Sequence, residues 1–273
     1  MASHGTPTVR LELDSRPECL TLIRGALSGI GETLAFEPEL LDDVKTAVSE
    51  ACSNVVLHAY GDDTGPLAVV VAVGPDRVQA VVHDRGAGIR SVSSAEDRMG
   101  VGLAVITALA ERAEFISTPG EGTEVRMEFA GHIGRPPRTA ELPQTMSIDG
   151  HVPHFELGGK VVVTLSSPVL LGAVLDRVAR GMAAEAHFSV NRIRELSPLA
   201  ETLATHTHAA AGENPLAFGL SATNRRLELM IGPVRSWSTA GLDTDFGALV
   251  AELDVDRAAE SETLRLIVSD PRS

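Results

Sequence analysis

Cysteine, aromatic residues and lysine are scarce in this sequence. Two of its 273 residues are cysteine, 3% are aromatic, and Lys45 and Lys160 are the only lysines. Because Cys19 and Cys52 are the only cysteines, we do not expect a disulfide scaffold. We expect the protein to reside in a reducing, cytoplasmic compartment. No apolar run approaches the roughly 18 residues that a membrane helix requires, and the N-terminus lacks a basic stretch followed by an apolar one. Neither a membrane span nor a signal peptide is therefore expected.

Acidic residues outnumber basic ones, and the formal net charge is −14. This balance argues against direct binding of nucleic acid and is suited to partners with basic surfaces. With 44% hydrophobic and 22% charged residues, the composition is that of a soluble globular protein. A length of 273 residues is sufficient for two domains.

The segment TAVSEACSNVVLHAY at residues 46–60 predicts an amphipathic helix. Glu50 and Asn54 lie one turn apart on its polar side, together with Asp43 and Ala47, so that the acid and the amide can point at one ligand. The opposite side carries the residues expected in the core: Val44, Val48, Ala51, Cys52, Val55 and Ala59. Taken alone, a Glu/Asn pair at this spacing is also typical of a solvated polar face.

Two apolar runs, residues 67–73 and residues 78–84, predict a β-hairpin around the turn Gly-Pro-Asp-Arg. Asp84 ends the second strand, and Gly86 and Gly88 follow it. A carboxylate at this point can accept a hydrogen bond from an exocyclic amine, and glycine allows a flat ring to approach the backbone. Taken alone, the same residues fit an ordinary Asp-Gly turn.

Two further glycine-rich segments follow. Residues 93–102, SSAEDRMGVG, form a polar loop that leads into a helix expected over residues 102–113, and such a helix N-terminus presents N–H groups to phosphate. Residues 120–129, GEGTEVRMEF, predict a glycine turn into a strand, with Thr123 able to offer its hydroxyl. Gly-x-Gly before a strand is common, so a structural role is equally open. The sequence has neither the Gly-Lys phosphate loop nor the dinucleotide fingerprint.

Taken in order, these segments (Glu-x-x-x-Asn, Asp-x-Gly-x-Gly, Gly-x-Gly and Gly-x-Gly-Thr) resemble the motifs of the Bergerat-fold (GHKL) ATPases. The stretch SEACSNVVLHAY and the short lid are most similar to the anti-sigma-factor serine kinases. The resemblance covers about residues 7–130. It implies an α/β fold of the two-layer α+β sandwich type, with a largely antiparallel sheet covered on one face by helices.

The resemblance also implies ATP and Mg²⁺ as cofactors, with a role for each matching position. Asn54 would hold Mg²⁺, and Glu50 would act as general base on an incoming serine hydroxyl. Asp84 would bind the N6 amine of adenine. The remaining positions would complete the pocket: Gly86 and Gly88 around the base, Thr123 supporting Asp84 through water, Gly100 and Gly102 at the phosphates, and Arg98 near the γ-phosphate.

The activity implied by this family is that of an ATP-dependent protein serine kinase acting as an anti-sigma factor. Such a protein would bind a sigma factor and phosphorylate an anti-anti-sigma (STAS-type) antagonist. Two alternatives remain open at this stage. One is a non-catalytic regulator whose partner binding is gated by ATP, and the other is the catalytic piece of a histidine-kinase phosphorelay.

The second half of the sequence repeats the first, weakly. Residues 161–188 match residues 9–36 at a constant shift of 152, and the apolar pattern continues through the next helix. We therefore expect an ATP-binding serine-kinase-like domain at residues 7–130, a linker at 131–158 and a degenerate ATPase-like domain at 159–273. A similar order of elements without duplication is the alternative.

The repeat lacks the nucleotide motifs. Its register replaces five positions, with Thr202 for Glu50, His206 for Asn54, Pro233 for Asp84, Arg235 for Gly86 and Ser261 for Gly122. The second half is therefore expected not to bind ATP. Because single-domain kinases of this type generally work as homodimers, an intramolecular pseudo-dimer with one nucleotide site is expected.

Overall fold

The chain folds into two units, Met1–Val152 and Pro153–Ser273. The structure is a computed structural model that describes residues 7–88, 101–118, 120–135, 160–211, 214–235, 249–257 and 261–271. Among these residues no helix is both long and apolar enough to cross a membrane.

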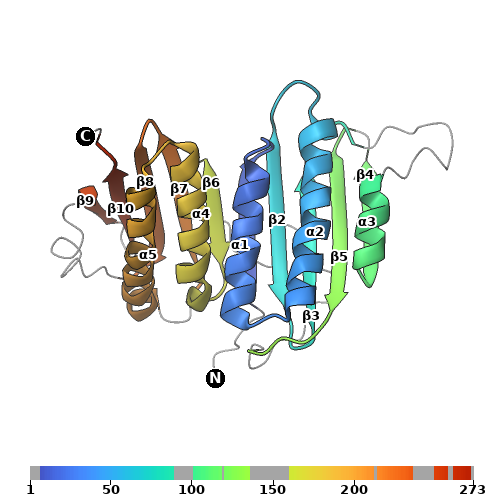
Figure 1. Ribbon diagram of the computed structural model, residues 1–273, viewed down its shortest axis with the longest axis horizontal. Helices are drawn as coiled ribbons and strands as arrows, with labels where there is room; N and C mark the ends of the chain where they lie inside the picture. The colour runs from blue at the N-terminus through green and yellow to red at the C-terminus, as the bar shows by residue number, and fades with distance from the viewer. Residues whose placement is uncertain are drawn as a thin grey trace. The chain divides into compact units, whose positions relative to one another are not determined.

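The first unit is an antiparallel sheet with helices on one face (Figure 1). Its elements are β1 (Thr8–Asp14), α1 (Cys19–Leu34), α2 (Pro38–Asn54), a π-helical turn η1 (Val55–Ala59), β2 (Pro66–Val73), β3 (Arg77–Asp84), α3 (Val101–Leu109), β4 (Arg112–Thr118) and β5 (Gly122–Ala130). The strand order is β4-β5-β3-β2-β1, and every neighbouring pair is antiparallel. The expected fold of helices on a largely antiparallel sheet is confirmed.

The core of the first unit lies between the sheet and α1 and α2. Leu11, Val69 and Val82 stand opposite one another on adjacent strands, and each is at most 1% exposed. Burial of each such side chain contributes about 1.5–3 kcal/mol. The strand β2 is buried on both faces, because Val70 and Ala72 on its other face are also at most 1% exposed. This explains why residues 67–73 are a continuous apolar run rather than an alternating one.

The boundary between α3 and β4 differs from the prediction. A helix was expected over residues 102–113, but α3 ends at Leu109 and β4 begins at Arg112. Arg112 pairs with Glu128 of β5, and the backbone N–H of Glu111 already donates to the Glu128 carbonyl. Pairing with a strand that follows later in the chain therefore overrides the local helical pattern.

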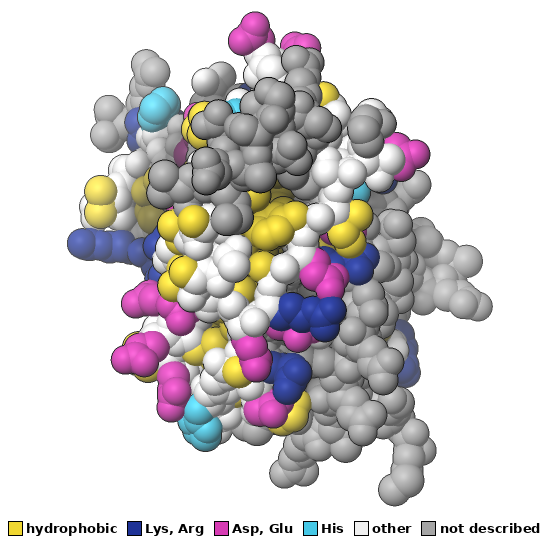
Figure 2. Space-filling model, turned by 90° about the vertical axis from the view of Figure 1, so that its right-hand side faces the viewer, with side chains coloured by type: hydrophobic (Ala, Val, Ile, Leu, Met, Phe, Trp, Pro, Cys, Tyr) yellow, Lys and Arg dark blue, Asp and Glu magenta, His cyan; other side chains and the backbone are white. Residues whose placement is uncertain are grey.

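Along the face shown in Figure 2, acidic and basic side chains are interspersed. The edge strand β4 carries the ion pair of Arg112 and Glu114, and charge on an edge strand disfavours pairing with other chains.

The first residues of the expected linker pack on the first unit. Ile133 is 1% exposed and forms an isolated antiparallel bridge with Phe36. The Gly134 N–H donates to the Ala35 carbonyl at 2.8 Å. Residues 131–135 therefore complete this unit, and residues 136–158 of the expected linker lie outside the described residues.

The second unit has the same order of elements in its described part. These are β6 (Val161–Leu165), a short 3₁₀ turn η2 (Pro168–Leu170), α4 (Leu171–Glu185), α5 (Val190–Ala211), β7 (Leu216–Thr223), β8 (Arg226–Val234), β9 (Val250–Arg257) and β10 (Glu262–Ser269). The strand order β6-β7-β8-β10-β9 is that of the first unit, and all of these neighbours are antiparallel. The starts of α4 and α5 each follow those of α1 and α2 by 152 residues.

Candidate functional site

The last turn of α2 carries the acid and the amide of the first motif. Glu50 and Asn54 are both half-buried, and the first turn of α3 lies directly against them. A Cβ atom on Gly102 would lie 2.9 Å from Glu50 Oε2 and 3.4 Å from Asn54 Oδ1. A side chain at this position would push against both groups. The structure thus brings the first and third motifs together at one point, and glycine permits the close approach.

The polar face of α2 is narrower than predicted. Ala47 was placed beside Glu50 by helical periodicity, but it is 0% exposed. The helix α3 packs against α2, and on the polar side of α2 the residues Asp43, Glu50 and Asn54 are half-buried. Cys52 is fully buried as expected, and burial raises the pKa of its thiol well above the ordinary value. Cys52 is therefore a core residue and not a nucleophile.

Asp84 ends β3 and is only 2% exposed. One of its carboxylate oxygens accepts a hydrogen bond from the Gly86 N–H at 2.8 Å. Burial raises the pKa of Asp84 above its ordinary value, and hydrogen bonds from the Gly86 and Thr123 amides oppose that rise. A buried carboxylate oriented by backbone amides is suited to accepting a hydrogen bond from a ligand donor rather than to binding water.

The loop after Asp84 packs on the end of η1. A Cβ atom on Gly86 would lie 2.2 Å from the Ala59 carbonyl oxygen, so this position admits no side chain. The next residue, Ala87, donates its N–H to the same carbonyl at 3.0 Å. Gly88 follows with φ +75° beside Ser117 and Thr118 of β4. The segment that carries Asn54 and the segment that carries Asp84 are thereby connected through backbone contacts.

Thr123 stands directly opposite Asp84 in the β3–β5 pairing. Its hydroxyl lies 3.4 Å from Ser117 Oγ. The neighbouring Gly122, with φ +106°, passes so close to the Asp84 backbone that a Cβ atom would lie 1.9 Å from the Asp84 carbonyl oxygen. The fourth motif therefore lies against the second. Gly100 and Arg98 lie outside the described residues.

The donor set of the site is compatible with a magnesium ion. In the described part of the chain, no three His, Cys, Asp or Glu side chains cluster in a way that could hold a metal. The oxygens of Glu50 and Asn54, however, both lie next to Gly102. Magnesium prefers oxygen ligands and usually retains water and substrate phosphate oxygens, so one or two protein oxygens are sufficient.

Sequence reasoning missed Tyr60 and the π-helical turn before it. Tyr60 is the residue after η1, and its hydroxyl lies between the backbones of Pro66 and Arg85. The available signal was its rarity, since Tyr60 is the only tyrosine in the chain. The π-helical turn itself has no periodic signature, although such turns are frequent at functional sites.

The chain is similar to known proteins in its first half. The family model of the histidine kinase-like ATPase domain matches residues 13–129. An anti-sigma F factor from Caldanaerobacter subterraneus subsp. tengcongensis is 36% identical over 137 residues, which are 46% of this chain and 94% of that protein. The chain therefore belongs to the histidine kinase-like ATPases. Within them it belongs with the anti-sigma factors, so the family resemblance seen in the motifs is confirmed.

Other relatives are matched over shorter stretches. The serine-protein kinase RsbW of Bacillus cereus (strain Q1) is 33% identical over 78 residues, which are 29% of this chain. The match spans about half (49%) of the length of that protein. Among solved structures, the RsbU and RsbW domains of Rv1364c from Mycobacterium tuberculosis match 49% of this chain and 34% of that chain, with 26% identity and a TM-score of 0.38.

Proposed function

We propose that the first unit is an ATP-dependent protein serine kinase that acts as an anti-sigma factor. The observation that carries this proposal is the contact of Gly102 with both Glu50 and Asn54, at the end of α2 that is tied to the Asp84 loop. An acid, an amide oxygen and a helix N-terminus then face one place, with a buried carboxylate nearby. The names of the relatives support the same conclusion.

The site divides into a base end and a phosphate end. At the base end, Asp84 would accept a hydrogen bond from the adenine amine, and the Gly86 amide keeps its carboxylate oriented. At the phosphate end, the first turn of α3 would offer backbone N–H groups and the positive end of its dipole. Asn54 would hold Mg²⁺ through its amide oxygen. When bound, Mg²⁺ neutralises phosphate charge and polarises the transferred group.

Glu50 would act as the general base. Its half-buried carboxylate would orient the serine hydroxyl of the protein substrate. It would accept the hydroxyl proton as the serine oxygen bonds to the γ-phosphorus of ATP and the bond from that phosphorus to the β–γ bridging oxygen breaks, with ADP as the leaving group. Phosphoryl transfer depends mainly on positioning and on charge stabilisation, and a located base is the main chemical group that the protein must add. Within this scheme Glu50 contributes to turnover and Asn54 to nucleotide binding, which makes the two residues separable by experiment.

The partners that this function implies are a sigma factor and a STAS-type anti-anti-sigma protein. The formal net charge of −14 is compatible with basic partner surfaces. The second unit, with Thr202, His206 and Pro233 at the corresponding positions, would not bind ATP. It would instead take the place of a second protomer in an intramolecular pseudo-dimer, which is supported by its shared strand order.

The kinase assignment is tested with the full chain, Mg-[γ-³²P]ATP and a purified STAS-type protein that carries an acceptor serine. We expect a labelled serine, and we expect Glu50→Gln to lower labelling by about 10²–10⁴-fold while calorimetric binding of Mg-ATP persists, because one general base contributes that factor. Asn54→Ala should lose the binding itself. The matched control is Asp42→Asn, which neutralises an exposed acid on the same helix and should change neither quantity.

Two outcomes would contradict the proposal in different ways. Calorimetry that detects no Mg-ATP binding to the wild-type chain would remove the nucleotide site altogether. Binding of Mg-ATP without any serine labelling, combined with partner affinity that rises with ATP and survives Glu50→Gln, would support the non-catalytic ATP-gated regulator instead.

A further inference from the structure

Tyr60 joins the strands β2 and β3 at the end where Asp84 lies. Its hydroxyl accepts a hydrogen bond from the Arg85 N–H at 2.8 Å and donates one to the Pro66 carbonyl at 2.6 Å. Since Leu67 pairs with Asp84, Pro66 and Arg85 are the next pair in the same register. The phenol oxygen is thus inserted between two backbone groups at the end of the ladder, and it satisfies both of them.

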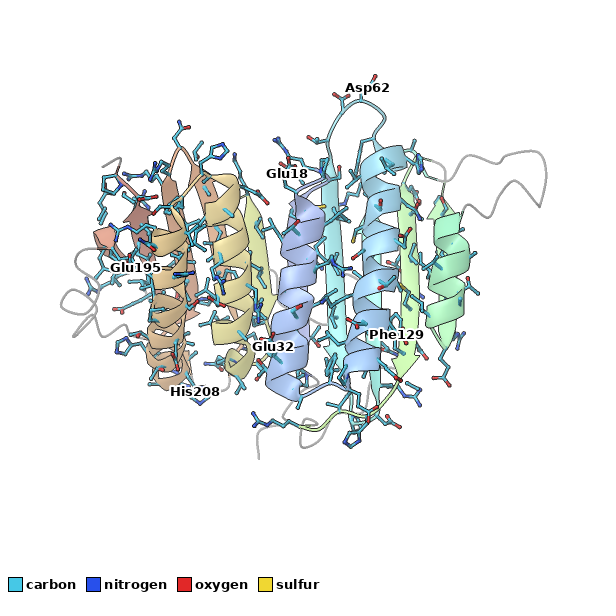
Figure 3. All side chains as sticks on the ribbon, viewed as in Figure 1. Glu18, Glu32, Asp62, Phe129, Glu195 and His208 are labelled. Carbon is cyan, nitrogen blue, oxygen red and sulfur yellow. The ribbon has the colours of Figure 1, made fainter. Side chains whose placement is uncertain are left out.

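The ring of Tyr60 packs against the backbone of Gly65. A Cβ atom on Gly65 would lie 2.2 Å from a ring carbon of Tyr60, so the ring rests on the bare backbone of that glycine. Between them, residues 61–64 are exposed, with Asp62 projecting away from the sheet at the top of this connection (Figure 3). A tyrosine hydroxyl has an ordinary pKa of about 10 and is therefore protonated and able to donate at neutral pH. Burial raises the pKa of Tyr60 further.

Tyr60 and Ala59 together hold the residues that follow Asp84. Tyr60 binds the N–H of Arg85, and the Ala59 carbonyl binds the N–H of Ala87. Gly86 lies between these two anchors, and its own N–H orients the Asp84 carboxylate. The loop that orients this carboxylate is therefore held by Ala59 and Tyr60, which follow α2 through the π-helical turn η1.

We propose that Tyr60 is a positioning residue that orients the Asp84 loop toward an adenine base and so sets the preference of the first unit for adenine nucleotides. This inference rests on the proposed nucleotide site and goes beyond it by naming a residue that acts on base selectivity. Tyr60 does so through the loop and without touching the nucleotide.

The test compares Mg-ATP with Mg-ITP by calorimetry on the full chain, because inosine carries an oxygen where adenine carries the amine. We expect wild type to prefer ATP and Asp84→Asn to lose that preference. Tyr60→Phe should lower the ATP-over-ITP preference about fivefold, the loss expected for one partly exposed hydrogen-bonded hydroxyl, with ITP affinity unchanged within about twofold. Gly65→Ala, which displaces the ring, should act in the same direction. Combining Tyr60→Phe with Asp84→Asn should add nothing further.

The matched control is Ser15→Ala, which removes the hydrogen bond that the Gly65 N–H donates to the Ser15 hydroxyl but leaves the Arg85 contact in place. It should retain the ATP-over-ITP preference. Thermal melting should first show that the Tyr60→Phe and Gly65→Ala variants are folded. The inference is overturned if both variants keep the full ATP-over-ITP preference, or if they lower the affinity for ATP and for ITP equally. A wild-type chain that binds neither nucleotide would remove the proposed function as well, so the two failures are distinguishable.

Discussion

In the first unit the second long helix changes at Asn54 into a π-helical turn, whereas in the second unit α5 remains α-helical to Ala211. His206 occupies the position that corresponds to Asn54, and the next residue, Thr207, is fully buried with its hydroxyl bonded to a carbonyl of the same helix. The Ala59 carbonyl at the end of the π-helical turn accepts the Ala87 N–H, whereas the Ala211 carbonyl at the corresponding position of α5 accepts the Asn214 N–H at 3.2 Å. The two units therefore differ in the backbone of this helix end as well as in its side chains.

The cores of the two units largely correspond. Most helix residues that are buried in the first unit have buried counterparts 152 residues later, including Leu22 and Val174, Ile23 and Leu175, Ala26 and Val178, Val44 and Leu196, and Ala51 and Leu203. None of these residues is one of the chemical groups of the proposed site, although Ala51 lies between Glu50 and Asn54. The comparison shows that the architecture depends on a set of apolar positions that is separate from the chemical groups of the site.

The outer faces of the helix pairs differ in charge. In the first unit the Arg24 guanidinium bridges to α2, donating to the Lys45 carbonyl at 3.2 Å and to the Ser49 hydroxyl at 3.0 Å. The corresponding position in the second unit is Asp176, which accepts a hydrogen bond from the Ser197 hydroxyl at 2.6 Å. The same helix packing therefore tolerates either sign of charge, because these side chains lie outside the core.

The largest effect is expected from a matched pair of core truncations. Leu27→Ala in the first unit and Leu175→Ala in the second remove side chains that are 2% and 1% exposed. Each should lower the free energy of unfolding by about 2–5 kcal/mol, the usual cost of such a cavity, as measured by urea denaturation. Leu57→Ala, at a residue that is 63% exposed, is the control and should cost less than about 0.5 kcal/mol. A cost under about 1 kcal/mol in either unit would contradict an equally packed core.

A smaller effect is expected at the nucleotide site proposed for the first unit. Gly102→Ala places a methyl group against Glu50 and Asn54, and we expect Mg-ATP affinity to fall about tenfold while the melting temperature is retained, because alanine favours helix. The control Gly172→Ala, at the first turn of α4 beside Ala204, should leave nucleotide binding unchanged. If the Gly102→Ala variant bound Mg-ATP as tightly as wild type, the two glycines would not differ in their effect on nucleotide binding, and the prediction would be contradicted.

The smallest effect concerns the segment that follows the first long helix of each unit, which is held by different contacts in the two units. The first unit packs Ile133 there, whereas in the second Asp270 accepts hydrogen bonds from the Ser189 N–H and from the Arg225 guanidinium. The Ser189 amide, followed by Arg225, lowers the pKa of Asp270 below its ordinary value. Asp270 therefore stabilises the fold above its unfolded pKa of about 3.9, and this stability is lost as the pH falls through the folded value.

Asp270→Asn should consequently lower stability in urea at pH 7 and have progressively less effect as the medium is acidified below the unfolded pKa. Ile133→Val is the matched change in the first unit, and its cost of about 1 kcal/mol should not depend on pH in this range. A stability difference between Asp270→Asn and wild type that persists unchanged into strong acid would contradict the assigned role of the carboxylate.

Much of the site could be anticipated from local patterns. The spacing of Glu50 and Asn54 on one helix and the position of Asp84 at a strand end depend on helical periodicity and on a hairpin, which short stretches of sequence specify. The predictions failed where a distant segment decided the outcome. Ala47 is buried on a helix against which α3 packs, and residues 112–113 pair with β5 instead of continuing a helix.

The sequence by itself determined the family, the order of the motifs and the apolar positions that both units bury, because these depend on residue type and spacing along the chain. Only the tertiary structure decided that Gly102 lies against Glu50 and Asn54, and that Tyr60 stands between Pro66 and Arg85. Contacts of this kind join residues from separate elements, and their geometry is set by helix packing and by a π-helical turn, neither of which has a local signature in the amino-acid sequence.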